Sequence, residues 1–243
     1  MKYVLFLILL GLVLLIFEGA RTWWYLSKAS AVVAQAQPYT QEGAGRSILV
    51  AGESTAYGTG AEDPRDSLAG RLGSAFPDAQ IDMAAVNGQK VSELVETLKE
   101  VEPTYDLLVI AIGGNDTIAR TPQDKLREDM REAWDLGKKV AEDVVVISTG
   151  NVGGAEAFGP VTGAWYTWQT RKVRESFLET TEAAGVGYAD LYAAGVNEQF
   201  AADPDQYYAA DGFHPSGAGY GLWFEVLLPV IETETGWNLP DID

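Results

Sequence analysis

The feature that most constrains the fold of this chain is a regular alternation, from residue 47 onward, of short apolar runs with amphipathic segments. The apolar runs are SILVAG (47–52), AQIDMAAV (79–86), YDLLVIAIGG (105–114), DVVVIST (143–149) and VGYADL (186–191). Such nearly continuous apolar runs are typical of strands that are buried on both faces. The helical period between them predicts helices at 68–76, 90–101, 122–140, 165–184 and 216–233. Strands that alternate with helices predict an α/β fold with a parallel sheet covered on both faces.

Functional side chains are expected at one edge of this sheet, because ligands bind at the carboxyl ends of the strands in open parallel sheets. The segments that follow the first four strands are GES (52–54), NG (87–88), GGND (113–116) and a long loop (150–163). The sequence has no GxxxxGK phosphate loop and no convincing GxGxxG fingerprint. The polar strand ends therefore favour chemistry carried by side chains.

The chain contains a single histidine, His214, which follows Asp211 by three residues in the segment DGFHPS. At this spacing in a turn, the carboxylate can accept a hydrogen bond from one imidazole nitrogen and leave the other free to act as a base. A serine nucleophile needs such a base together with an orienting acid. Ser54 is the candidate nucleophile, although its surroundings differ from the GxSxG elbow of α/β-hydrolases.

Two further residues can supply the hydrogen-bond donors that a tetrahedral oxyanion requires. The backbone amide of Gly88 can approach an oxyanion closely because glycine has no side chain. The side-chain amide of Asn115 follows two glycines and can point at the same oxygen. Taken singly, these residues and Ser54 are equally well explained as helix caps or turn residues. Their joint occurrence at successive strand ends favours a serine hydrolase.

The order of these blocks resembles that of the SGNH (GDSL-like) hydrolase family. The matching blocks are AGESTA, AAVNGQKV, IGGNDT and DGFHPS, within about residues 47–231. The resemblance implies a flavodoxin-like three-layer α/β/α sandwich with about five parallel strands, and ester hydrolysis without a metal or a cofactor. It also implies a catalytic triad and an oxyanion hole, with the triad formed by Ser54, His214 and Asp211 and the oxyanion hole by Ser54, Gly88 and Asn115.

One residue departs from the family pattern. Glu53 stands before the serine, where the family usually has Asp. The extra methylene changes how the serine loop can be braced, and it motivates an alternative in which the chain is an inactive binding or scaffold module. A second alternative is an acyltransferase that uses the same acyl-enzyme. For an esterase, the substrates considered are short acyl esters, lysophospholipids and O-acetyl groups on envelope sugars.

Aromatic residues near the fourth strand and before Asp211 are candidates for the substrate pocket. Phe158, Trp165 and Tyr166 belong to the segment that follows the fourth strand, and Tyr208 precedes Asp211 by three residues. We expect these four to bind substrate. Trp168 is expected to pack its helix against the sheet instead.

The amino-terminal segment predicts a transmembrane helix. Residues 3–17 read YVLFLILLGLVLLIF without a charge, and Trp23 and Trp24 extend the run toward the length of a spanning helix. A cleaved signal peptide is the alternative, with ASA (29–31) as its cleavage site. An uncleaved anchor is favoured, which would place the catalytic body outside the cytoplasm. The expected organisation is an anchor (1–26), a flexible tether (27–45), a hydrolase domain (46–233) and a carboxy-terminal tail (234–243).

Composition excludes several other classes of function. The chain has 17 Lys and Arg against 35 Asp and Glu, a net charge of −18, which argues against nucleic acid as a partner. It has no cysteine, so disulfides, thiolate catalysis and cysteine-based zinc sites are excluded. The expected partners are an ester substrate and, through the amino-terminal helix, a membrane. The oligomeric state stays open.

Overall fold

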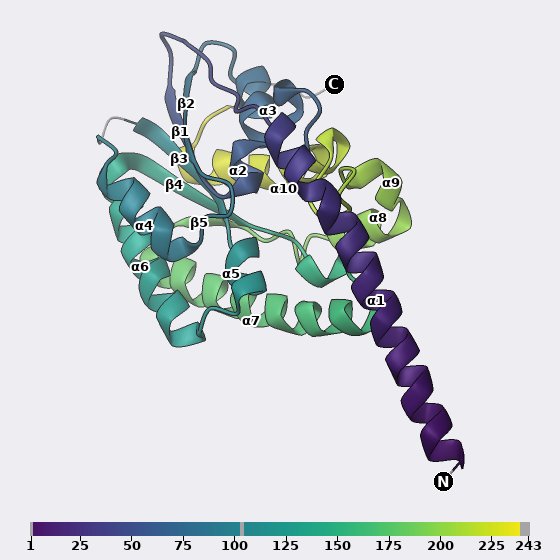
Figure 1. Ribbon diagram of the computed structural model, residues 1–243. Coiled ribbons are helices and arrows are strands. Elements are labelled where there is room, and N and C mark those ends of the chain that lie inside the picture. The colour runs from purple at the N-terminus through teal and green to yellow at the C-terminus, as the bar shows by residue number, and fades with distance from the viewer. Residues whose placement is uncertain (1, 103–104, 239–243) are drawn as a thin grey trace.

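The computed structural model describes residues 2–102 and 105–238, and its centre is one parallel five-stranded sheet (Figure 1). The strand order is β2-β1-β3-β4-β5, which is a flavodoxin-like order. The strands are β1 (Ser47–Gly52), β2 (Gln80–Ala85), β3 (Tyr105–Ile112), β4 (Ala141–Ser148) and β5 (Gly187–Ala189). The predicted parallel sheet and flavodoxin-like fold are therefore confirmed.

Helices cover both faces of the sheet and form two separate cores. On one face, α3 (Leu68–Ala75), α8 (Val196–Ala202) and α10 (Gly217–Thr235) pack against alternate strand residues such as Ile48 and Val50. On the other face, α4 (Val91–Lys99), α6 (Gln123–Val140) and α7 (Pro160–Ala184) pack against Leu49 and its neighbours. Successive residues of a strand point to opposite faces, which explains why the strands are apolar throughout.

Four short helices were not predicted from the sequence. They are α2 (Ser54–Tyr57), α5 (Gly114–Ala119), α8 and α9 (Pro204–Tyr207), and two 3-10 turns lie at Pro64–Asp66 and Val152–Gly154. All four have seven residues or fewer, which is too short for a helical period to emerge. α7 also begins earlier than predicted, because Pro160 suits the first helical position and the Gly159 amide donates to Thr162 Oγ1 at 3.1 Å.

The amino-terminal helix is longer than the expected anchor. α1 (Lys2–Gln35) includes residues 27–35, which were expected to belong to a flexible tether. The segment KASAVVAQ (28–35) is rich in good helix formers, so the helix continues. Beyond it, Gln41 pairs with Ile81 through two backbone hydrogen bonds of 2.8 and 3.0 Å. The structure therefore differs from the predicted flexible tether in two places: residues 27–35 are helical, and Gln41 pairs with Ile81 of β2.

The two halves of α1 have different surroundings. The amino-terminal half projects away from the body (Figure 1), and its large apolar side chains are exposed up to Phe17. The second half packs on the body, where Arg21 Nε donates to the carbonyl of Glu156 and Thr22 Oγ1 to that of Ala157, both at 2.8 Å. Among the described residues, α1 is the one helix long and apolar enough to cross a membrane. An anchor and a signal sequence are both consistent with it.

The expected carboxy-terminal tail is only partly described. α10 extends to Thr235, and the ring of Trp237 packs edge-on against Phe76 at a centroid distance of 5.2 Å. Residues 239–243 of the expected tail lie outside the described residues.

Candidate active site

The candidate site lies where the strand order reverses, between the carboxyl ends of β1 and β3. Ser54 is the first residue of α2, directly after β1, and Asn115 lies in the first turn of α5, directly after β3. The residues of β1 and β3 are paired in parallel register from Ile48–Leu107 to Gly52–Ala111, which brings these two strand ends together. Ligands of doubly wound sheets bind at such a switch point.

The structure brings Ser54, His214 and Asp211 into one hydrogen-bonded series. His214 Nε2 lies 3.1 Å from Ser54 Oγ, and His214 Nδ1 lies 2.6 Å from Asp211 Oδ2. Asp211 Oδ1 also accepts hydrogen bonds from the backbone amides of Phe213 and His214, at 3.0 Å each. The imidazole is thus held with one nitrogen toward the serine hydroxyl, as a general base requires.

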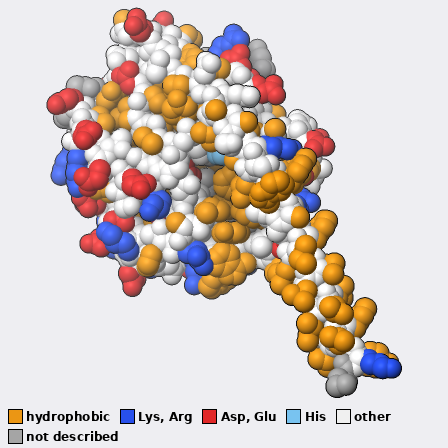
Figure 2. Space-filling model, viewed as in Figure 1, with side chains coloured by type: hydrophobic (Ala, Val, Ile, Leu, Met, Phe, Trp, Pro, Cys, Tyr) orange, Lys and Arg blue, Asp and Glu red, His pale blue; other side chains and the backbone are white. Residues whose placement is uncertain are grey.

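Asp211 stays ionised although it is completely buried. Burial opposes the ionised carboxylate, but the hydrogen bond from His214 and the two backbone amides outweigh it and lower the pKa of Asp211. The histidine is visible as pale-blue atoms in a hollow of the surface (Figure 2). The imidazole therefore borders the pocket, while the carboxylate of Asp211 is closed off from water.

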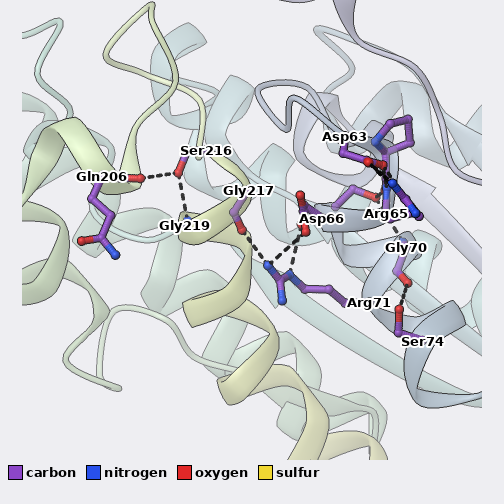
Figure 3. Close-up of polar contacts among 12 residues, drawn as sticks. Asp63, Arg65, Asp66, Gly70, Arg71, Ser74, Gln206, Ser216, Gly217 and Gly219 are labelled. Carbon is purple, nitrogen blue, oxygen red and sulfur yellow. Dashed lines mark hydrogen bonds and ion pairs between the residues drawn. The ribbon is translucent and has the colours of Figure 1, made fainter.

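The loop that carries His214 is fixed at its far end by polar contacts with neighbouring elements (Figure 3). Ser216 Oγ donates to the carbonyl of Gln206 at 2.6 Å and accepts from the Gly219 amide at 3.1 Å, so Ser216 caps α10. Arg71 of α3 donates to the carbonyl of Gly217 at 2.8 Å. These contacts hold the segment after the histidine against α3 and α9, which limits movement of the imidazole.

Glu53 explains how the serine loop is braced despite its departure from the family pattern. Its carboxylate accepts hydrogen bonds from the backbone amides of Gly114 (2.9 Å) and Asn115 (3.0 Å) and from Asn115 Nδ2 (2.7 Å). A Cβ on Gly114 would lie 2.9 Å from Glu53 Oε1, so glycine leaves room for the longer acid. Glu53 therefore joins the serine loop directly to the start of α5.

The charge of Glu53 is costly in this position. The pKa of Glu53 is raised to about 7, mainly because burial disfavours the charged carboxylate; the amides of Asn115 and Gly114 lower it, and the nearby Asp116 adds to the rise. Near neutral pH the acid is thus close to its midpoint. Its protonation state determines how firmly it accepts from the Asn115 side chain.

The side chain of Asn115 uses both of its N–H groups within the site. Besides the bond to Glu53, Nδ2 lies 3.2 Å from the backbone carbonyl of Gln89. The longer bond is the weaker one, so the hydrogen directed at Gln89 is the one that an oxyanion could take over. Asn115 also lines the pocket beside Ser54.

Gly88 lies in the turn after β2, and it does not line the pocket beside Ser54. Its φ is +84°, and a Cβ at this position would meet nothing within 4 Å. The left-handed backbone conformation therefore favours glycine at this position. Its role as an oxyanion donor stays a prediction.

A small pocket of about 60 Å³ lies beside Ser54 and His214. Tyr208 lines it, as predicted, whereas Phe158, Trp165 and Tyr166 do not. Trp165 and Tyr166 lie on α7, which begins at Pro160, and Phe158 lies in the segment before that helix. Phe158 instead packs against Tyr166 and Phe213, with ring centroids 4.5 and 6.1 Å apart.

Several residues of the pocket were missed by the sequence analysis. Their side chains are mostly apolar and come from the turn after β4 and from α8 and α10; they are Val152, Ala155, Val196, Phe200 and Trp223. Val196 and Phe200 are four residues apart and share one side of α8. That spacing was the available signal, but the helix has only seven residues and was not predicted.

Within the described ranges, no group of three or more His, Asp or Glu side chains is arranged to hold a metal ion.

The comparisons with known proteins agree with this fold. The model of the GDSL-like Lipase/Acylhydrolase family matches residues 50–222. Among curated proteins, none matches this chain.

Solved structures resemble the chain at low sequence identity, so they support the fold alone. A member of the lipolytic protein G-D-S-L family from Veillonella parvula is 16% identical with a TM-score of 0.59, covering 76% of this chain and 97% of that one. The acetylxylan esterase Axe2 from Geobacillus stearothermophilus is 20% identical with a TM-score of 0.55, covering 78% and 95%. An extracellular lipase from Streptomyces rimosus is 15% identical with a TM-score of 0.55, covering 79% and 100%.

Proposed function

The chain belongs to the GDSL-like lipase/acylhydrolase family and is an ester-bond hydrolase, and from this premise we propose that it is a serine esterase with Ser54 as its nucleophile. The observation that carries the proposal is the series Ser54–His214–Asp211, with separations of 3.1 and 2.6 Å. This geometry favours the active enzyme over the scaffold alternative, because Glu53 braces the serine loop instead of disrupting it.

In the proposed mechanism, Ser54 Oγ attacks the ester carbonyl carbon while His214 Nε2 takes the hydroxyl proton. The tetrahedral intermediate collapses, the C–O bond to the alcohol breaks, and the alcohol leaves with the proton from His214. Water then attacks the acyl-enzyme, again with His214 as the base, and releases the acid and free Ser54. Asp211 holds the imidazole in place and stabilises its charged form.

The oxyanion would be held by the backbone amides of Ser54 and Gly88 and by the side chain of Asn115. Asn115 would keep its bond to Glu53 and direct its other hydrogen from the Gln89 carbonyl to the oxyanion. This exchange costs little, because the bond given up is the longer of the two. Glu53 then serves as the group that positions Asn115.

The pocket supports a short acyl group as the part of the substrate that enters it. Its volume is about 60 Å³, enough for a few water molecules or an acetyl-sized group. The apolar wall formed by Val152, Phe200 and Trp223 suits the methyl end of such a group. Among the substrates considered, O-acetyl and other short acyl esters fit better than lysophospholipids.

We also propose that α1 is an uncleaved membrane anchor and that the catalytic body lies on the extracytoplasmic side. The support is the exposed apolar half of α1 and the close packing of its second half on the body. A cleavage at residues 29–31 would remove contacts made by Arg21 and Thr22. Protease accessibility of the body in intact cells and in spheroplasts tests the side.

The proposed function is tested with p-nitrophenyl esters of increasing acyl length. The full chain is expected to hydrolyse the acetyl ester fastest, and Ser54→Ala to lose roughly 10⁴-fold or more of kcat while staying folded. Ser74→Ala, which changes an exposed serine on α3, is the matched control. A wild-type chain inactive on all esters would favour the scaffold, and acyl transfer to an added alcohol in preference to water would favour the acyltransferase.

A further inference from the structure

One side of α7 exposes large apolar side chains to the surroundings of the body. Outside α1, the described residues expose five such side chains, and four of them lie on α7. Val161, Trp165 and Trp168 are 56%, 38% and 49% exposed. Their spacing of four and three residues places them on one side of the helix. We call these three residues the α7 face.

Two cations accompany the tryptophans of the α7 face. Lys172 Nζ lies 3.7 Å from the centre of the Trp168 ring, and the Arg120 guanidinium lies 5.7 Å from that of Trp165. Tryptophan with a neighbouring basic side chain is typical of the layer where lipid headgroups meet acyl chains. The pairs also give the face a local positive charge on a chain whose net charge is −18.

α1 is joined to α7 at the end where this face begins. Glu18 of α1 accepts hydrogen bonds from the backbone amides of Val161 (2.7 Å) and Thr162 (2.9 Å), the free donors of the first turn of α7. Arg21 and Thr22 add the two bonds to the preceding segment described above. The position of the α7 face relative to α1 is therefore fixed by contacts rather than by a flexible linker.

The apolar surface of α1 leads directly to this junction. Phe17, 61% exposed, is followed by the buried Glu18, and Trp23 is 72% exposed one and a half turns further on. α7 runs sideways from the point where the projecting half of α1 leaves the body (Figure 1). Apolar atoms also gather on the body beside that point (Figure 2).

We propose that the α7 face rests in the interfacial layer of the same bilayer that α1 enters. The inference rests on the proposed anchoring by α1. A bilayer is the occupant favoured here because the face continues the apolar surface of the anchor and carries tryptophan with cations. A second copy of this acidic chain would meet electrostatic repulsion. The body then lies against the membrane.

This placement gives the site a side that faces the bilayer. A series of ring contacts leads from Trp165 through Tyr166, Phe158 and Phe213 to His214, with centroid distances of 4.9, 4.5, 6.1 and 5.2 Å. The α7 face is therefore connected to His214 by a continuous series of packed rings. The substrate class that suits it is a short acyl ester whose alcohol portion is held in the membrane.

The chain has no cysteine of its own, so an introduced cysteine can be labelled at one chosen position. The depth of the α7 face in the bilayer can then be measured from the label. Single cysteines carrying a nitroxide are placed at Ala164, exposed beside the face, at Leu12 on α1, and at Glu100, exposed at the amino end of the sheet. The full chain is reconstituted in phosphatidylcholine vesicles, and accessibility to oxygen is compared with that to a water-soluble nickel chelate. The proposal predicts that the labels at 164 and 12 favour oxygen and the label at 100 favours the chelate.

The other outcomes separate the two proposals. If the label at 164 is in water while the label at 12 is in lipid, the proposed membrane contact of the α7 face is overturned and the anchoring by α1 stands. A label at 12 in water overturns the anchoring itself. A label at 164 that is shielded from both reagents shows that a second copy covers the face instead, which overturns the inference. None of these label measurements depends on hydrolytic activity.

Substitutions in the α7 face test whether its contact with the membrane affects hydrolysis of a membrane-held ester. Val161→Ser combined with Trp168→Ser should lower hydrolysis of hexadecyl acetate carried in vesicles roughly tenfold, because the site loses its orientation toward the bilayer. Hydrolysis of soluble p-nitrophenyl acetate should stay unchanged. Leu178→Ser, which changes an exposed apolar residue of α7 outside the face, is the matched control. An equal rate on the vesicle-held ester for the double variant and the control would overturn the proposal.

Discussion

Two buried glutamates hold the starts of two helices in this molecule, and they do so for different purposes. Glu53 accepts the backbone amides of Gly114 and Asn115 at the start of α5, and Glu18 accepts those of Val161 and Thr162 at the start of α7. Both carboxylates are nearly inaccessible, with 2% and 4% exposure. Both satisfy donors that a helix leaves unpaired in its first turn.

The difference lies in what else each carboxylate touches. Glu53 also accepts from the side chain of Asn115, so it acts on a group of the candidate active site. Glu18 accepts amides of residues that lie 143 and 144 positions further along the chain. It therefore acts on the position of the whole body relative to α1. One contact should therefore control turnover and the other the attachment of the anchor.

The largest effect is expected at the active-site junction. Asn115→Ala removes the proposed oxyanion donor, and the loss of such a donor typically costs on the order of 2.7–4 kcal/mol, or a hundredfold or more in kcat. Steady-state kinetics with p-nitrophenyl acetate measure it, with thermal unfolding as the check on folding. An Asn115→Ala variant with wild-type turnover would remove Asn115 from the mechanism.

The coupling of Glu53 to Asn115 can be tested in the same assay. If Glu53 acts by positioning Asn115, Glu53→Ala should lower kcat strongly in the wild-type chain and add little in the Asn115→Ala chain. Additive losses in the double variant would mean that Glu53 acts on catalysis by another route.

A smaller effect concerns the stability of the Glu53 junction as a function of pH. The pKa of Glu53 is raised from its ordinary 4.5 to about 7 in the folded chain, so between these values the folded state keeps a proton that the unfolded state has released. Stability from this group is therefore fully present below about pH 4.5 and is lost as pH rises through 7, by about 3 kcal/mol in total. Urea unfolding between pH 5 and 8 measures the slope.

Glu53→Gln is the matched variant, because the amide has the same shape and does not titrate in this range. Subtracting its stability curve from that of the wild type should leave a decline toward high pH. A flat difference between pH 5 and 8 would contradict the raised pKa.

The smallest effect on soluble-ester turnover is expected at the other glutamate. Glu18→Ala should speed hydrogen exchange of the Val161 and Thr162 amides, because these donors lose their acceptor, while hydrolysis of p-nitrophenyl acetate stays near the wild-type rate. Glu175→Ala, at an exposed acid of α7, serves as the control. Unchanged exchange at both amides would show that α1 and α7 do not depend on this contact.

Much of the fold could be predicted because its signals are local. The five strands were predicted from their apolar runs, and the five longer helices of the body from their period. Four short helices were missed, since a helix of seven residues or fewer shows no clear period and is stabilised mainly by its tertiary contacts. The pocket residues Val196 and Phe200 were missed for the same reason.

The candidate site was predicted for a different reason, namely that parallel strands deliver their carboxyl ends to one edge. Ser54 and Asn115 were assigned from that rule, and His214 with Asp211 from their spacing. The pocket aromatics were predicted less well, because position after a strand does not determine which way a side chain points. Tyr208 lines the pocket, whereas Phe158, Trp165 and Tyr166 do not.

The sequence by itself determined the parallel sheet, the apolar amino-terminal helix and the residue types that can carry ester hydrolysis, because these depend on periodicity and composition. Only the tertiary structure decided what the two glutamates do. In the sequence, Glu53 is a one-methylene departure from a family pattern, and Glu18 is the first charged residue after the apolar run 3–17. Each accepts amides from a helix far away in the sequence, and such contacts depend on how elements pack rather than on any local signal.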